Sequence, residues 1–471
     1  MARAVCVDFG ERQVEIRVPD DATVVEFTDP ALIADPQAAV REALAAPLGA
    51  APLAELARPG MKVAIGFDDI TRPALPAQAI LAAIVEELGR AGVKDRDITF
   101  ITACSNHRKN TRTELARHLG PALFNRFWPL DAIRNHDCDD PEGLRFFGIT
   151  DSGRYVEHNR TFMDADLQIY QGNVSAQAWK GYTGTGAIIG LASTKSIASH
   201  HSFHTVPDPA KKLEHRKAAG KKLPGMKPEM TEFLEKATGK KTFYVNAVTG
   251  SGGRLAGVFA GHASAVTPPA WELAGRCFTR EVPQADVLVV GLGAQYSYGT
   301  SHNTLIAAVG ACVPPRYSPE LPVLREGGVV IAMTPSMGQI DPDRFPSYQA
   351  LIDAYARHHD IRALVDHEET FNGNPAYRQK YRHGFAYPPL HAFWIFYELE
   401  YALNRAAAVI VAGTPNPGAF RNLGLQTAPD FDAAWKIARR YVGANPRTVV
   451  APTFWTRPRI KFAVKGGEAA A

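Results

Sequence analysis

The stretch MKVAIGFDDITRP (residues 61–73) opens the part of the chain that decides the fold. Its first seven residues form a short apolar and β-branched run, which predicts a buried strand. PAQAILAAIVEELGRAG (76–92) then repeats apolar residues at helical spacing, and ITFITACS (98–105) predicts a second strand. Thr111 and Glu114 follow with the spacing of a capping box, which predicts the start of another helix. This alternation is typical of a parallel α/β sheet.

Charged side chains follow both predicted strands. Asp68, Asp69, Thr71 and Arg72 come after the first strand, and His107 comes after the second. In parallel sheets the loops at the carboxyl ends of the strands gather on one edge, and ligands bind there. We therefore expect the Asp68–Arg72 loop and His107 to face the same site.

Each of these residues has a functional and a structural interpretation. Arg72 suits bidentate binding of a substrate carboxylate, with Asp69 orienting the guanidinium, but the same loop can equally hold a salt bridge and a helix cap. His107 suits a general base because the ordinary pKa of histidine is about 6.5. The chain has fifteen histidines, however, and a lone histidine is more often structural.

The rest of the chain extends the α/β pattern. DLQIYQG (166–172) predicts a strand, and the runs KTFYVNAVTG and RLAGVFAG predict a hairpin around residues 250–253. A second alternation follows residue 265, with strand-like runs at 287–293, 327–333, 406–413 and 448–454 and helical patterns at 391–406 and 430–443.

The sequence therefore predicts two α/β domains with parallel or mixed sheets. We expect an N-terminal catalytic domain over 1–265 and a C-terminal α/β domain over 266–445. The final segment, 446–471, is expected to pack back on the first domain.

Composition narrows the class of protein. The 471 residues are 46% hydrophobic and 21% charged, with a net charge of +4, which is ordinary for a globular protein and gives no reason to expect a nucleic-acid partner. The positive excess lies in residues 211–241, which lack the interleaved aromatics of a single-strand binder. Five scattered cysteines, acidic residues near the start and the lack of a long apolar stretch predict a reduced cytoplasmic protein with no membrane partner.

Two further motifs bear on ligand binding. His200, His201 and His204 lie close enough to place two imidazoles on one face of a helix, yet they lack the other donors of a metal site and are equally consistent with a polar turn. TGTGAIIG (183–190) is similar to a dinucleotide fingerprint, but no strand directly precedes it and no acidic residue follows at the expected distance. NAD binding is therefore disfavoured.

Taken together, the motifs DDITRP (68–73), NHRKNTRTEL (106–115), NHDCDD (135–140), the long segment 147–193 and FYVNAV with GVFAG (243–261) resemble the nickel-dependent lactate racemase family. The similarity covers most of residues 60–265 and continues more loosely beyond them. The resemblance implies two α/β domains with the site between them. It also implies a nickel pincer cofactor derived from nicotinic acid, usually tethered to a lysine and also bound by a histidine.

Site residues follow from the resemblance one at a time. Arg72 matches the anchoring arginine, with Asp69 and Thr71 beside it, and His107 matches the first catalytic histidine. His201, or alternatively His200, matches the nickel ligand. The second catalytic histidine falls on Gln177, and Asn303 falls on a substrate-binding position of the second domain.

The chain departs from the family where the tether is expected. The position of the family's tethering lysine falls at Thr185 or Ala187, and the position of a second-domain lysine falls on Ile306, so this chain has no lysine at either. Lys180 and Lys195 flank the site as substitutes for the tether, and a cofactor held without a covalent bond is equally consistent. Tyr182, which is also a candidate cofactor contact, and His200 are candidates for the missing base.

The resemblance implies a racemase or epimerase of a small-molecule 2-hydroxyacid other than lactate. In that family a histidine removes the hydroxyl proton while hydride passes reversibly to the cofactor. The alternative is a divergent member that binds a hydroxyacid or a related anion without racemising it. The sequence does not indicate an oligomeric state.

Overall fold

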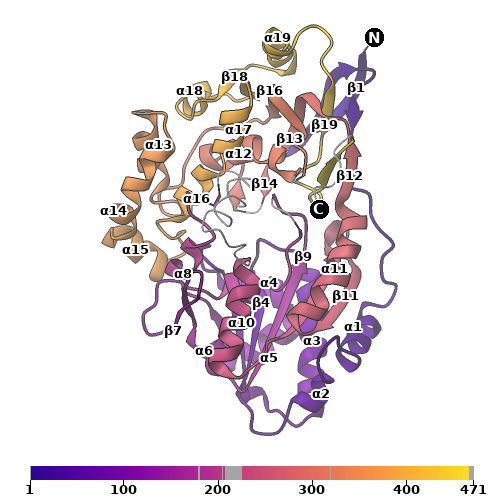
Figure 1. Ribbon diagram of the computed structural model, residues 1–471, viewed down its shortest axis with the longest axis vertical. Coiled ribbons are helices and arrows are strands. Elements are labelled where there is room, and N and C mark those ends of the chain that lie inside the picture. Colours follow the sequence, from indigo (N-terminus) through magenta and orange to yellow (C-terminus); the bar gives the residue numbers. More distant parts are fainter. Residues whose placement is uncertain are drawn as a thin grey trace.

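The computed structural model describes residues 2–178, 181–203, 205–206, 225–296, 298–318 and 320–465. Its two main sheets lie in separate lobes that follow one another along the long axis of the molecule (Figure 1). Parallel pairing dominates both sheets, which confirms the predicted α/β class with parallel or mixed sheets.

The first lobe is built on a six-stranded sheet in the order β11-β10-β9-β4-β5-β6. Only β11 runs antiparallel to its neighbour, so the predicted hairpin of β10 and β11 is confirmed. The strands are β4 (Val63–Asp68), β5 (Ile98–Ala103), β6 (Ile133–Asn135), β9 (Leu167–Val174), β10 (Phe243–Thr249) and β11 (Leu255–Gly261). A separate antiparallel pair consists of β7 (Leu144–Ile149) and β8 (Tyr155–Asn159).

Helices cover both faces of this sheet, so β4 and β9 are buried along their length. They are α1 (Pro36–Ala45), α2 (Leu53–Leu56), α3 (Ala74–Arg90), α4 (Arg112–Leu119), α5 (Pro121–Phe127), α6 (Arg160–Asp164), α7 (Ala187–Gly190), α8 (Thr194–Ala198), α10 (Met226–Thr238) and α11 (Ala263–Phe278). Thr111 and Glu114 form the predicted capping box of α4.

One helix in this lobe is less exposed than its basic composition suggests. The run PGMKPEMTEFLEKATGKK (224–241) predicts an exposed helix with connecting loops, but Met226, Met230 and Leu234 of α10 are buried in the core. These residues recur every four positions and so share one face. The prediction of an exposed helix was wrong for this face, because the charged residues dominate the composition and hide the apolar stripe.

The second lobe is built on an eight-stranded sheet in which β18-β17-β16-β13-β1-β2 form one path, with β19 and β3 joined at β13. Its strands are β1 (Ala2–Gly10), β2 (Arg12–Pro19), β3 (Thr23–Val24), β13 (Ala285–Gly293), β16 (Leu324–Met333), β17 (Ala408–Ala412), β18 (Gln426–Ala428) and β19 (Thr448–Ala451). Two small pairs accompany it: β12 (Thr279–Val282) with β20 (Lys461–Val464), and β14 (Gln295–Tyr296) with β15 (Gly299–Thr300).

The first strands of the chain thus lie in the second lobe. Phe9 and Gly10 of β1 pair with Leu292 and Gly293 of β13. The division at residue 265 stays a prediction, and this pairing argues for placing residues 2–24 with the second unit. The final segment contacts both lobes, because β19 and β20 pair with second-lobe strands while the Lys461 ammonium donates a hydrogen bond to a carbonyl at residue 181.

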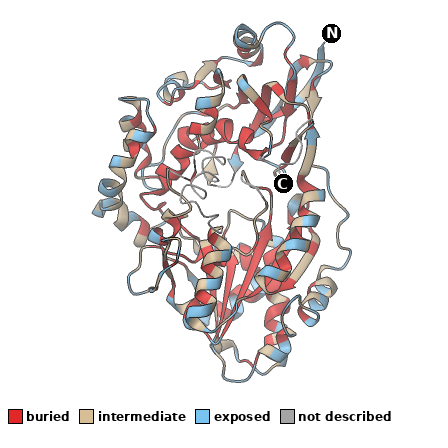
Figure 2. Ribbon diagram, in the orientation of Figure 1, coloured by how far each residue is buried: buried red, intermediate tan, exposed pale blue. Residues whose placement is uncertain are grey.

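The helices of the second lobe surround its sheet. They are α12 (Thr304–Cys312), α13 (Tyr348–Ala356), α14 (Glu368–Asn372), α15 (Pro375–Arg382), α16 (His391–Tyr397), α17 (Glu400–Arg405), α18 (Pro417–Arg421) and α19 (Phe431–Val442). The single helix predicted over 391–406 is therefore two helices separated by residues 398–399. Figure 2 shows that the buried residues line the sheets and the helix faces packed on them. No helix in the described ranges is long and apolar enough to span a membrane.

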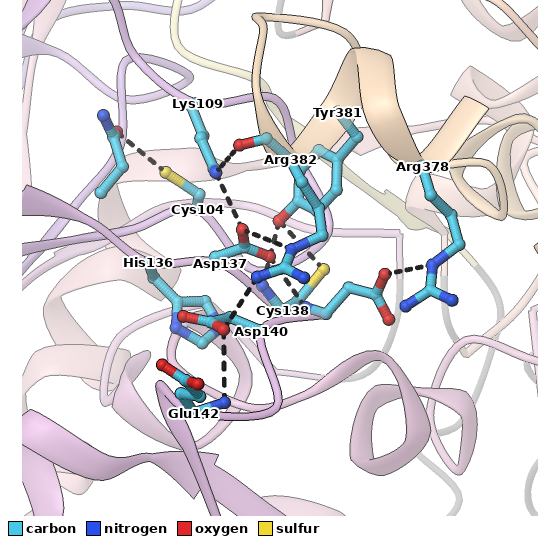
Figure 3. A network of polar contacts seen from close by, with 12 residues as sticks. Cys104, Lys109, His136, Asp137, Cys138, Asp140, Glu142, Arg378, Tyr381 and Arg382 are labelled. Carbon is cyan, nitrogen blue, oxygen red and sulfur yellow. Dashed lines mark hydrogen bonds and ion pairs between the residues drawn. The ribbon is translucent and has the colours of Figure 1, made fainter. Parts of the chain in front are cut away.

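A polar interface joins the lobes beside the site (Figure 3). The segment 135–140 contacts α15: Arg382 pairs with Asp140 at 2.8 Å, and the Tyr381 hydroxyl accepts the Cys138 backbone N–H at 3.0 Å. Lys109 donates to Asp137 at 2.8 Å and to the Arg382 carbonyl at 2.6 Å. The NHDCDD motif therefore holds the second lobe against the first.

Candidate active site

The loop after β4 begins with Asp68, whose carboxylate joins two strands. It accepts hydrogen bonds from the Tyr170 hydroxyl and from the Asn173 backbone N–H, each at 2.7 Å. Both donors lie on β9, which pairs with β4. Asp68 therefore shapes the edge of the sheet on which the rest of the site is built.

Asp69 is the buried anchor of the loop, with 4% of its surface exposed. Its carboxylate accepts hydrogen bonds from the backbone N–H and the hydroxyl of Thr71, and its other oxygen lies 2.7 Å from Nδ1 of His107. Burial raises the pKa of Asp69, but His107, Thr71 and Arg72 outweigh it and lower the pKa to about 2. Asp69 is thus a permanent carboxylate that orients the His107 ring.

His107 reaches this position through a tight turn after β5. Ser105 has a φ of +53°, in the left-handed region that few non-glycine residues adopt. Its backbone N–H donates to the Gly190 carbonyl at 2.8 Å, and the His107 N–H donates to the Cys104 carbonyl at 2.7 Å. The predicted meeting of the Asp68–Arg72 loop with His107 is confirmed by the contact between His107 and Asp69.

Arg72 presents most of its guanidinium to the site. Nη1 donates to the Thr71 hydroxyl at 3.0 Å and lies 3.4 Å from the Thr71 carbonyl oxygen. The other guanidinium N–H groups have no hydrogen-bond partner among the described residues. Burial lowers the pKa of Arg72, but Asp68 and Asp69 outweigh it and raise the pKa. The group is a fixed cation with donors available for a carboxylate.

The second lobe supplies an aromatic wall opposite this loop. The Tyr298 ring lies 5.3 Å from the His107 ring, measured between centroids, and 5.1 Å from the ring of His391. The Tyr387 hydroxyl donates to the Tyr298 carbonyl at 2.8 Å, which fixes this segment. Burial raises the pKa of Tyr298 to about 12, so its hydroxyl stays neutral.

His391 is a residue that the sequence analysis missed. It begins α16, has 2% of its surface exposed, and its ring lies 5.9 Å from that of His107 at an angle of 85°. Its Nδ1 is 2.7 Å from the Tyr348 hydroxyl. Burial, together with the charges of His107 and His201, lowers the pKa of His391 well below its ordinary value. The HAFWIFY run gave no chemical signal, because a lone histidine in an apolar helix indicates a core position.

Lys227 is a second residue that was missed. Its ammonium donates to the Gly184 carbonyl at 2.8 Å, within the segment where the resemblance places the tethering lysine. Burial lowers the pKa of Lys227 to about 8. The charge of Asp68 raises this pKa, and the charge of Arg72 lowers it further. The helix that carries Lys227 lies some 40 positions further along the chain, so comparison by sequence position alone does not find it.

The histidine pair lies beside the second-lobe wall. His200 and His201 follow α8 in a turn, with their Nδ1 atoms 3.1 Å apart, and the His201 ring is 4.6 Å from that of Trp394 on α16. His204 lies outside the described residues. Among the residues that the structure describes, no group of three or more His, Cys, Asp or Glu side chains is arranged to hold a metal ion.

The other predicted residues contact different parts of the chain. Gln177 donates to the Tyr182 carbonyl at 3.2 Å, and the Tyr182 hydroxyl is 2.9 Å from that of Thr279. Lys195 is exposed, with its ammonium 5.6 Å from the centre of the Tyr155 ring. Lys180 lies outside the described residues. The functional roles of these residues stay predictions.

Asn303 caps α12 rather than lying free in the site. Its side-chain oxygen accepts the backbone N–H groups of Leu305 and Ile306 at 3.0 and 3.2 Å. Its amide nitrogen is buried and has no hydrogen-bond partner in the described structure. Whether it binds substrate stays a prediction.

The glycines of the TGTGAIIG segment have a packing role. A Cβ on Gly186 would lie 2.7 Å from the Tyr170 hydroxyl oxygen, and one on Gly190 would lie 2.7 Å from Cβ of Ala103. The segment therefore needs glycine to approach β9 and β5 closely. Close packing therefore explains why these glycines resemble a dinucleotide fingerprint, and no dinucleotide is needed to explain them.

The fold and the site define a class of protein: two α/β lobes whose facing surfaces bring a carboxylate-bound histidine, an arginine and a second histidine together. Residues 9–213 match the family described as the lactate racemase N-terminal domain. The resemblance to the lactate racemase family is thereby confirmed for this part of the chain.

Two kinds of relative support this assignment. A lactate racemase from Thermoanaerobacterium thermosaccharolyticum is 24% identical over 300 residues, which are 62% of this chain and 64% of that protein. The matched region thus spans less than two thirds of the curated relative. The structure of the lactate racemase apoprotein from the same organism matches 98% of this chain and 100% of its own, with a TM-score of 0.72 and 19% identity.

A crystal structure of a Thermotoga maritima protein also has this fold. It matches 93% of this chain and 100% of its own length, with a TM-score of 0.56 and 15% identity. At such identities the two structural matches establish the fold of the whole chain and leave its chemistry to be argued from the residues.

Proposed function

We propose that the protein is a racemase or epimerase of a small 2-hydroxyacid, acting by removal of the hydroxyl proton and reversible hydride transfer from C2. The observation that carries the proposal is the Asp69–His107 pair beside Arg72. The family match supports this type of reaction. The proposal extends to a substrate other than lactate, because Gln177 and Ile306 stand where the family is expected to have histidine and lysine.

Arg72 binds and orients the substrate carboxylate. Its unpartnered N–H groups match the two oxygens of a carboxylate, and the fixed cation supplies the charge. Asp69 and Thr71 hold the loop so that the guanidinium does not rotate away. The hydroxyl group on the neighbouring carbon then lies on the side of His107.

His107 accepts the hydroxyl proton at Nε2. The contact of Nδ1 with the Asp69 carboxylate fixes the tautomer that carries its proton on Nδ1, so the lone pair of Nε2 is available. Asp69 also stabilises the imidazolium that forms. The aromatic wall around Tyr298 limits water near the pair and strengthens these electrostatic contacts.

The residues present fit a nickel pincer cofactor, because the chain offers a side chain for the metal and side chains for the anionic groups of the cofactor. His201 offers an imidazole for the metal, and Lys227 and Arg72 are cations for its anionic groups. The cofactor, when bound, supplies the acceptor and donor for the C2 hydride.

Co-expression with the cofactor-building enzymes tests this function. The purified protein is examined by elemental analysis and intact mass, and then with each enantiomer of lactate, malate, glycerate and 2-hydroxyglutarate, with the products separated by chiral chromatography. We expect bound nickel and interconversion of at least one pair of enantiomers. Protein that carries neither nickel nor cofactor after co-expression, and that interconverts none of the pairs, would overturn the proposal.

The alternative function is binding of a hydroxyacid or related anion without turnover. The observation that favours it is Gln177, which cannot take a proton and bonds the Tyr182 carbonyl. Calorimetric titration with the same acids separates the two, because binding without interconversion supports only this alternative. Turnover that disappears in both His107→Ala and Arg72→Ala would exclude it.

A further inference from the structure

We propose that His391 is the second acid–base residue of the site and serves the enantiomer whose hydroxyl faces away from His107. The inference rests on the proposed function and deepens it. It assigns to the second lobe the role that sequence position assigned to Gln177.

Stereochemistry requires such a group. If Arg72 holds the carboxylate and the C2 hydrogen faces one hydride acceptor, the two enantiomers place their hydroxyl groups on opposite sides of C2. A single base on one lobe then reaches only one of them. The second proton acceptor has to come from the side opposite His107, and this side is formed by the second lobe.

His391 meets this requirement by position. Its ring faces that of His107 across 5.9 Å, nearly perpendicular to it, and both rings contact Tyr298. The two residues come from opposite lobes, on α16 and on the loop between β5 and α4. No described His side chain other than His391 makes a ring contact with His107.

The two imidazoles are also held in the same way. Each is fixed through Nδ1 to an oxygen, from Asp69 in the first lobe and from the Tyr348 hydroxyl in the second, at 2.7 Å in both cases. Within the described part of the chain, neither Nε2 atom has a hydrogen-bond partner. His107 is partly exposed and His391 is buried, and each ring is anchored through Nδ1. The Tyr348 hydroxyl can donate or accept, so His391 acts as a base in the tautomer that carries its proton on Nδ1 and leaves Nε2 available.

Gln177 does not offer this arrangement. Its side-chain nitrogen is bound to the Tyr182 carbonyl within its own loop, and an amide does not accept a proton near neutral pH. Tyr182, another candidate base, is directed to Thr279 and to the ring of Trp271. His391 is therefore better placed than either.

The proton balance closes over one turnover. His391 Nε2 takes the hydroxyl proton of one enantiomer as hydride leaves C2, and the planar 2-ketoacid forms. The planar ketoacid then turns about its C1–C2 bond, which presents the other face of C2 to the same hydride source and moves the oxygen from His391 to His107. Hydride returns to that face, and the oxygen takes a proton from Nε2 of His107, which is protonated at the start of this direction. His391 has gained one proton and His107 has lost one, and exchange with solvent restores both. The opposite direction uses the same steps with the two residues exchanged.

The test follows each enantiomer separately in the cofactor-loaded protein. The substrate is the acid from the panel of four that the wild type interconverts fastest, and the 2-ketoacid formed in a single turnover is measured after an acid quench. We expect His391→Gln to lower steady-state interconversion by about 100-fold or more and to abolish ketoacid formation from one enantiomer only. His107→Gln should abolish it from the other enantiomer.

Matched variants keep the test decisive. His358→Gln changes an exposed histidine of the same lobe and should behave as the wild type. Tyr348→Phe keeps the His391 ring but removes its anchor, and should weaken the same enantiomer's half-reaction less than His391→Gln does. The thermal unfolding midpoint shows whether His391→Gln folds. If it does not fold, Tyr348→Phe replaces it in the test.

Two results would overturn the assignment. One is a loss of ketoacid from both enantiomers to the same degree in the folded His391→Gln and Tyr348→Phe variants, which indicates a structural role. The other is wild-type behaviour of these variants. Both differ from failure of the proposed function itself, in which the wild type interconverts none of the acids.

Discussion

The two walls of the site differ in chemical character. The first lobe contributes charge: Asp69 and Arg72 are ionised, and His107 is bound to a carboxylate. The second lobe contributes neutral rings, since burial keeps Tyr298 protonated and lowers the pKa of His391 far below its ordinary value. Under the proposed function, substrate charge is recognised on one side only, and the other side contributes shape, exclusion of water and a neutral base.

This difference means that the two walls should respond differently to substitution. Changes in the first-lobe wall remove a charge or a charge-assisted contact, which affects binding, catalysis and pH dependence together. Changes in the second-lobe wall should leave carboxylate binding nearly intact. The following predictions test that division.

Loss of the His107 imidazole should have the largest effect. His107→Gln removes the group that takes the hydroxyl proton, and we expect kcat to fall by about 1,000-fold with little change in KM. Chiral chromatography of the products measures the rate. A kcat within tenfold of the wild type in a folded variant would show that His107 is not the base, and His358→Gln serves as the control.

Replacement of Arg72 by lysine tests recognition of the carboxylate. Arg72→Lys keeps the positive charge but removes the planar fork, so we expect KM to rise by about 10- to 100-fold and kcat to change less. Arg90→Lys, an exposed residue at the end of α3, is the matched control and should have no effect. An unchanged KM in Arg72→Lys would mean that the carboxylate is bound elsewhere.

The Asp69 carboxylate should contribute a pH-dependent part of the stability. Its pKa is lowered from 3.8 to about 2 in the folded protein, so its ionised form stabilises the fold above the unfolded value and this contribution is lost as pH falls through about 2. The shift corresponds to about 2 kcal/mol. In urea unfolding, the stability difference between wild type and Asp69→Asn should be that much larger at pH 6 than at pH 2. A difference independent of pH would contradict this.

The sequence allowed the first-lobe wall to be predicted, because its geometry follows from local pattern and neighbouring strands. β4 and β5 are adjacent and parallel, so the residues that follow them meet at one edge. The capping box of α4 fixed the chain direction after His107. These inferences needed no contact between distant parts of the chain.

The second-lobe wall was not predictable in the same way. His391 meets His107 only because the lobes are docked, and their separation of 284 positions leaves no local trace. The pairing of β1 with β13 is equally non-local. Burial of a histidine among apolar residues also looks the same in sequence whether the ring is a core residue or a base. Tertiary packing decides between these outcomes.

The smallest expected effect comes from the interface between the lobes beside the site. A change there alters how the lobes dock without removing a residue that acts on the substrate. Arg382 lies at this interface with Asp140 at 2.8 Å, and both side chains are partly exposed, so solvent screens the pair. Arg382→Ala should therefore lower stability by only about 1 kcal/mol.

The Arg382→Ala variant also tests whether docking positions His391. If the α15 interface holds α16 in place, the half-reaction assigned to His391 should slow more than the one assigned to His107, because Arg382→Ala keeps the backbone carbonyl that accepts from Lys109 beside His107. Single-turnover ketoacid formation from each enantiomer measures this, and Arg276→Ala, which removes an exposed pair on α11, is the control. Equal slowing of both half-reactions would show that the interface acts on the site as a whole.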